Sequence, residues 1–108
     1  MAEQDASLQS LSATQIPPSV IYSHLRLDAA YLSQDDMDLI DAEYAASIAY
    51  VRERCGIEDE YMDGHPDIAV AVLVLVRDMW DNRSLYVDKS NPNRLVEGVL
   101  ALHDHNLL

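Results

Sequence analysis

The sequence predicts an all-α fold, a compact bundle of about four helices in the order short, long, long, short. Two stretches carry apolar side chains at helical spacing, and prolines and small polar residues stand where helices begin. The chain has 108 residues, 49% of them apolar, with only three glycines, four prolines and no phenylalanine. This composition suits a single globular domain and is unlike that of a turn-rich β-sandwich or barrel.

The amino-terminal part is expected to form an arm followed by a short helix. Residues 1–17 are mostly small and polar, which indicates an arm that is either flexible or ordered only on a partner. Pro18 suits the first turn of a helix, where its missing N–H is not needed. A helix over 18–25 places Ile21 and Leu25 on one side, and residues 28–32 then form a connector.

The most strongly marked element is a long helix that begins after Ser33 and ends at Gly56. Ser33 is a candidate N-cap, and aspartates in the first turn complement the positive end of the helix dipole. Gly56 stands where a left-handed cap is expected, and an acidic loop over 58–64 follows it. Apolar residues recur at steps of three and four, at Met37, Ile40, Tyr44, Ile48, Val51 and Cys55.

A second long helix is expected to begin at Pro66 and to reach about Arg83. Residues 68–76 form a continuous apolar run, which by itself also suits a buried strand. Because no second strand-like run exists for it to pair with, a central buried helix is favoured. After a loop over 84–90, Asn91 and Pro92 begin a short helix to Leu102, and a tail over 103–108 follows. The expected core includes Tyr44, Ile48, Val72, Val76 and Trp80.

The charge of the chain excludes several classes of partner. Nineteen acidic residues against seven basic ones give a net charge of −12 at neutral pH. A protein that grips nucleic-acid phosphates needs a basic patch, and so does a peripheral protein of anionic membranes. The longest apolar run, residues 68–76, is far shorter than the roughly 20 residues of a membrane-spanning helix. The sequence therefore predicts no membrane partner and no specific binding of DNA.

The acidic loop matches a calcium-binding pattern only in part. Asp59, Asp63 and Gly64 fall at the first, fifth and sixth positions of such a loop. Tyr61 and Val70 stand at two positions where oxygen ligands are required. A solvated loop is therefore the preferred interpretation.

The remaining reactive side chains give no pattern of catalysis. His103 and His105 flank Asp104 with no third ligand marked in the sequence, and we expect them in a frayed, exposed tail. Cys55 lies on the apolar stripe, which suits a small core residue better than a nucleophile. The sequence thus predicts no enzyme, no cofactor and no metal site.

Several short motifs, taken in their order, resemble a known protein family. They are His24-Leu25-Arg26-Leu27-Asp28, Asp35-Asp36, Ala45-Ala46 with Ile48, residues 71–76, Trp80-Asp81-Asn82-Arg83, and residues 95–102. Over about residues 18–102 the chain is similar to the head–tail connector proteins of long-tailed bacteriophages and prophages, also called head-completion, adaptor or DNA-packaging proteins. It departs from their pattern in having Trp80 where tyrosine is usual, a longer arm and a more acidic loop.

The resemblance implies a structural protein with a place in the virion. Residues 18–102 would be a helical connector domain whose copies form a closed ring of about twelve subunits, matched to the portal. The ring would dock on the phage portal protein and provide the platform for a stopper or tail-completion protein. DNA would pass through it without specific binding, at the head–tail junction of the virion. Before assembly the subunit would be in the host cytoplasm.

Two groups of residues are the candidate site. A polar cluster within or between subunits is expected from Arg26, Asp28, Asp36 and Arg83. An acidic channel lining or docking surface is expected from Asp38, Asp41, Glu58, Asp59, Glu60 and Asp63. Between residues 28 and 67 the chain has twelve acidic residues against two arginines, a local net charge of −10, which would repel DNA phosphates at short range.

Two other functions are compatible with the sequence. A small acidic protein can mimic DNA or inhibit a nucleic-acid enzyme, which requires carboxylates spaced like phosphates on one face. A small helical metal-dependent enzyme would use His103, His105 and residues of the acidic loop, and metal analysis of the purified protein discriminates it.

Overall fold

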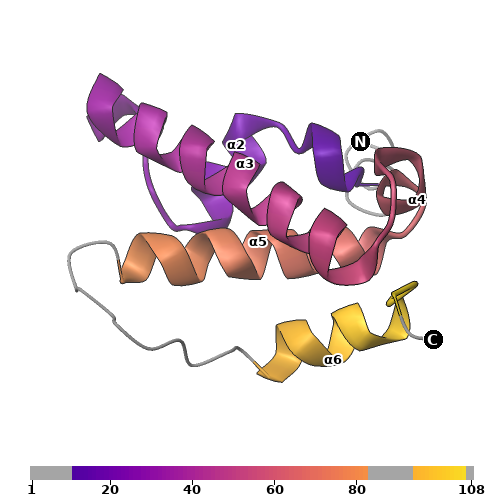
Figure 1. The fold of residues 1–108 in the computed structure, drawn as a ribbon. Helices are drawn as coiled ribbons and strands as arrows, with labels where there is room; N and C mark the ends of the chain where they lie inside the picture. Colours follow the sequence, from indigo (N-terminus) through magenta and orange to yellow (C-terminus); the bar gives the residue numbers. More distant parts are fainter. Residues whose placement is uncertain (1–10, 83–93, 107–108) are drawn as a thin grey trace.

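The all-α prediction is confirmed by the computed structural model, which describes residues 11–82 and 94–106 (Figure 1). Within these two ranges 76% of the residues are helical and no strand is present. Two 3₁₀ helices precede and follow the first α-helix. In chain order the elements are η1 Ala13–Gln15, α2 Pro18–His24, η2 Ala29–Tyr31, α3 Gln34–Cys55, α4 Asp59–Asp63, α5 Pro66–Asp81 and α6 Arg94–Leu102.

The long helix α3 begins and ends where the sequence predicts. The Ser33 hydroxyl accepts a hydrogen bond from the Asp36 N–H at 3.0 Å, and the Asp36 carboxylate accepts one from the Ser33 N–H, which completes a capping box. Gly56 ends the helix with a left-handed φ of 67°. Four residues of the predicted stripe are buried, while Met37 and Tyr44 are partly buried.

Helix α5 is the central element, as its apolar sequence predicts. It lies between α3 and α6 and packs against both (Figure 1). Val72, Val76 and Trp80 are buried, while Val70 and Arg77 are exposed, so one side of the helix faces solvent. The prolines at its start and at the start of α2 take first-turn positions. The helix ends at Asp81. The described residues do not include Arg83, the predicted loop 84–90 or the predicted helix start at Asn91 and Pro92.

The prediction of a flexible arm over 1–17 is wrong for residues 11–17, the part that the structure describes. Ala13 and Ile16 are buried, because the η1 segment packs against α4 and α5. The Tyr44 hydroxyl donates to the Ala13 carbonyl at 2.6 Å and accepts from the Ile16 N–H at 3.0 Å. A side chain of α3 thus holds this segment on the domain. Residues 1–10 lie outside the described residues.

Two further expectations are corrected. Residues 58–64 are not an open loop, because Asp59–Asp63 form the short helix α4, which buries Met62 completely. The tail after α6 is not frayed over 103–106: His103 is 8% exposed, and the His105 N–H donates to the Cys55 carbonyl at 2.6 Å. The end of the described chain is therefore fixed to the end of α3.

Candidate functional site

The six carboxylates predicted as one acidic surface lie in two separate places. Asp38 and Asp41 are exposed on the first half of α3. The other four lie beyond the last turn of α3, in α4 or just before it: Glu58, Asp59, Glu60 and Asp63. Since α3 rises about 1.5 Å per residue, roughly 20 Å of helix separate Asp41 from Cys55. The structure therefore does not bring the six residues onto a single small surface.

The first half of α3 carries carboxylates without arginine partners. Asp35, Asp38 and Asp41 are exposed, and none of them forms an ion pair with a residue that the structure describes. Asp38 accepts a hydrogen bond from the Gln34 amide at 2.9 Å, which leaves its charge in place. This end of the molecule thus presents uncompensated negative charge to solvent.

The carboxylates around α4 are partly committed to the fold. The Arg52 guanidinium contacts Asp59 at 2.6 Å. The Asp63 carboxylate accepts hydrogen bonds from the Thr14 N–H at 2.8 Å and from its hydroxyl at 2.7 Å, so it fastens η1 to α4. Glu58 and Glu60 are exposed. Among the described residues, only Asp59 of these four carboxylates pairs with an arginine, so this end of α3 also presents negative charge to solvent.

The predicted polar cluster is not assembled among its three described members. Asp28 caps η2 by accepting from the Ala30 N–H, and Asp36 belongs to the capping box of α3. Arg26 is exposed and holds a left-handed φ of 61° just after α2, with no ion pair inside the described ranges. The fourth member, Arg83, lies outside these ranges. Local capping thus uses the carboxylates that the sequence suggested for arginine.

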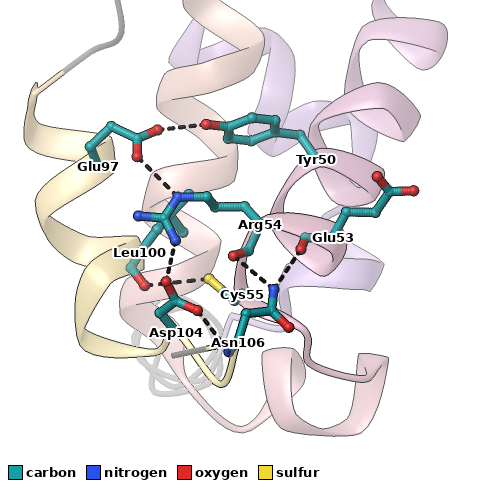
Figure 2. A network of polar contacts seen from close by, with 8 residues as sticks. All are labelled: Tyr50, Glu53, Arg54, Cys55, Glu97, Leu100, Asp104 and Asn106. Carbon is teal, nitrogen blue, oxygen red and sulfur yellow. Dashed lines mark hydrogen bonds and ion pairs between the residues drawn. The ribbon is translucent and has the colours of Figure 1, made fainter. Parts of the chain in front are cut away.

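A polar network that the sequence did not reveal joins the end of α3 to α6 and the segment after it (Figure 2). The Arg54 guanidinium contacts Glu97 at 3.2 Å and Asp104 at 2.5 Å. The Tyr50 hydroxyl donates to the second oxygen of Glu97 at 2.6 Å. The Asn106 amide donates to two carbonyl oxygens at the end of α3, at 2.9 and 3.2 Å. One arginine therefore ties three separate parts of the chain together.

The titration behaviour of this network follows from its contacts. The hydrogen bond from the Asn106 N–H and the Arg54 guanidinium lower the pKa of Asp104. The hydrogen bond to Glu97 raises the pKa of Tyr50. Burial raises the pKa of the Cys55 thiol, whose Sγ donates to the Leu100 carbonyl at 3.4 Å. This thiol is therefore a core residue in a poor environment for a nucleophile.

A second cluster gathers imidazole rings around Tyr61. The Nδ1 atom of His103 lies 2.9 Å from the Tyr61 hydroxyl, and its Nε2 atom lies 2.7 Å from the Asp67 carboxylate. The His65 ring stacks on Tyr61 with ring centroids 4.1 Å apart, and the His105 ring meets its edge. Both nitrogens of His103 are thus engaged in contacts that hold the segment after α6 on α4 and α5.

His24 is the one histidine remote from this cluster. Its Nε2 atom is buried without a hydrogen-bond partner among the described residues, and burial, assisted by Arg77, lowers its pKa. The neutral ring is therefore favoured. A shallow open groove runs beside the same helix, lined by Ser19, Tyr22, Ser23, Leu27, Asp28 and Ala29. A single carboxylate in this groove gives it no pair of acid and base.

The described residues show no metal-binding cluster and no membrane-spanning helix. Across residues 11–82 and 94–106, no three histidine, cysteine or acidic side chains are placed to hold one metal ion. No helix in those ranges has the length and apolar character needed to cross a membrane. Comparison with protein-family models, with curated proteins and with solved structures gives no match for this chain. The exposed carboxylates on the first half of α3, which have no arginine partner among the described residues, are one feature available to a partner.

Proposed function

We propose that this chain is a structural subunit of the head–tail connector ring of a long-tailed phage or prophage. The ring docks on the portal protein, extends the DNA channel and offers a platform to a stopper or tail-completion protein. The motifs at 24–28 and 80–83 support the proposal through their similarity to that family. The all-α fold is also the one that this resemblance implies.

The observation that carries the proposal is the exposed first half of α3. Asp35, Asp38 and Asp41 have no arginine partner among the described residues, in a chain of net charge −12. A channel through which duplex DNA slides must avoid binding phosphates, and like charge repels them within about 8 Å at physiological salt. These carboxylates have the charge and exposure that a channel lining or an acidic docking surface requires.

The connector role needs no catalytic residue, cofactor or metal ion. The ring would contain about twelve copies in the virion, set by the symmetry of the portal. The subunit would reside in the host cytoplasm until it joins the head–tail junction. The portal and the stopper or tail-completion protein are its partners, and DNA passes without being specifically bound.

The experiment is reconstitution with the portal protein encoded near this chain in its genome. Electron microscopy of the mixture is expected to show a ring of added density on one face of the portal. A variant with Asp35, Asp38 and Asp41 changed to lysine is expected to retain duplex DNA in a mobility-shift assay, whereas the unmodified assembly does not. The matched control changes Glu58 and Glu60, which lie beyond the opposite end of α3, to lysine, and it is expected not to retain DNA.

Two results would contradict the connector proposal. One is a genome without portal, capsid or terminase genes around this chain, combined with no binding to any portal. The other is tight, salt-sensitive binding of the free chain to a basic nucleic-acid-binding protein in competition with DNA. The second result would favour the alternative function of an acidic DNA mimic, which the same carboxylates of α3 would serve.

A further inference from the structure

Helix α6 presents an apolar stripe to solvent. Leu95 is 64% exposed and Leu102 is 78% exposed. They are seven residues apart and therefore lie on one face of the helix, with Gly98 between them. The opposite face is packed on the domain through Val96 and Leu100, which are buried. We call Leu95, Gly98 and Leu102 the α6 stripe.

Gly98 has no role inside the described domain that requires glycine. A Cβ added to it meets no atom within 4 Å, and its backbone has no positive φ. Glycine in a helix interior is disfavoured relative to alanine, so Gly98 weakens α6, and no contact within the described residues requires it. The absence of a side chain does allow another backbone to approach α6 closely between two exposed leucines.

A surface of complementary character lies where α3 begins. Leu39 is 39% exposed on the first turns of α3, together with the exposed carboxylates of Asp35 and Asp38, and Tyr31, which is 86% exposed, precedes the helix in η2. We call these four residues the acidic end. At the start of α6, Arg94 is exposed and pairs with no carboxylate that the structure describes. Each surface thus offers apolar side chains together with charge of opposite sign.

The two surfaces cannot meet within one chain. Helix α6 contacts the last turns of α3, where Tyr50 bonds to Glu97 (Figure 2). Asp38 precedes Tyr50 by about 18 Å of helix, and the start of α3 extends away from α6 (Figure 1). A contact between the surfaces must therefore join two molecules. Because the two surfaces differ, a pair of copies joined by this contact still has one free α6 stripe and one free acidic end. The same contact can therefore repeat from copy to copy.

We propose that the α6 stripe of one copy docks on the acidic end of a second copy, with Arg94 beside Asp35 and Asp38. This inference rests on the proposed function and assigns Asp35 and Asp38 to its acidic docking surface rather than to the channel lining, since it names the two faces through which connector subunits would meet. The apolar residues supply the contact area, Gly98 sets how closely the chains approach, and the charges fix the orientation.

The test is sedimentation of the full chain over a concentration series at physiological salt, because two copies of net charge −12 repel each other most strongly at low salt. The unmodified chain is expected to form oligomers, and the double variant Leu95→Asp with Leu102→Asp is expected to associate at least about tenfold more weakly. Val70→Asp, at an exposed apolar position of α5 outside both surfaces, is the matched control and should not change association. A chain that stays monomeric up to about 1 mM would overturn the inference.

Gly98→Ala separates an interface role from a merely structural one. Alanine favours the helix, so the variant is expected to melt at a higher temperature than the unmodified chain. It is also expected to associate several-fold more weakly, because the new methyl group keeps the second chain away. Higher stability together with unchanged association would remove Gly98 from the interface and contradict the proposed contact.

A charge exchange tests which surface is the partner. Arg94→Glu is expected to weaken association several-fold, and adding Asp38→Arg in the same chain is expected to restore it. Failure of the second change to restore association would overturn the pairing. Binding to the portal is measured separately, and it distinguishes failure of the docking inference from failure of the connector function. If the variants associate normally and still bind the portal, the docking inference fails and the connector function stands.

Discussion

At the scale of single residues, Gly56 is a position that requires glycine. Its φ of 67° is strained for any residue with a Cβ. The Asn106 side chain lies in the space that a Cβ would take, and it donates to the carbonyls of Glu53 and Arg54. The glycine therefore ends α3 and also makes room for the segment after α6.

Gly56→Ala is expected to destabilise the protein by about 1–2 kcal/mol from the backbone alone, and further if Asn106 is displaced. Denaturant unfolding of the variant and the unmodified chain measures the difference. Gly64→Ala is the control, because Gly64 has a negative φ and a Cβ there meets its neighbours at ordinary distances. Equal stability of Gly56→Ala and the unmodified chain would contradict the close seating of Asn106.

At the scale of elements, the segment 103–106 acts as a strap between α3, α4 and α5. Asp104 pairs with Arg54 near the end of α3, and His103 lies between Tyr61 of α4 and Asp67 of α5. The strap thereby connects parts of the chain that are 36 to 50 residues apart in sequence. Its stability depends on the charge state of the groups that hold it.

The strap is expected to loosen in acid. Because the folded pKa of Asp104 is lowered, its charge stabilises the fold above the unfolded value of about 3.9 and loses that effect as the pH falls through the folded pKa. Asp104→Asn should therefore be less stable than the unmodified chain at neutral pH, with the difference shrinking below about pH 4. Urea unfolding over a pH series measures this. A difference that is constant with pH would contradict the charged contact with Arg54.

The elements that the sequence predicts well are those with local signals. The capping box at Ser33, the glycine at Gly56 and the proline at Pro66 act within a few residues, so their effects are visible in the sequence. Helix α4 was missed because five residues contain too little periodicity, and its packing depends on burying Met62. The network of Arg54 was missed because its partners are distant in sequence.

The candidate site was predicted less well than the fold, for a related reason. The negative charge between residues 28 and 67 is plain in the composition, but its division between two ends of α3 follows from the length of that helix. The sequence predicts that Asp28 and Asp36 pair with arginines, whereas their carboxylates accept hydrogen bonds from nearby backbone N–H groups. Local hydrogen bonds need no loop closure, so they outcompete distant partners of the same strength.

At the scale of the whole molecule, the excess of negative charge sets the response to salt. With a net charge of −12, repulsion between carboxylates opposes the compact state. Raising the salt concentration shortens the screening length from about 10 Å at 0.1 M to about 3 Å at 1 M and should raise the melting temperature by several degrees. A variant with Asp35, Asp38 and Asp41 changed to asparagine should respond less. A melting temperature that falls with added sodium chloride would contradict this reasoning.

Trp80 gives this protein a built-in optical reporter. It is the only tryptophan of the chain, and its side chain is 7% exposed near the end of α5. Its emission should shift to longer wavelength when the helices separate, because the indole then meets water. Docking through the α6 stripe and the acidic end leaves the indole covered. Tryptophan fluorescence can thus distinguish unfolding of the chain from association between folded copies.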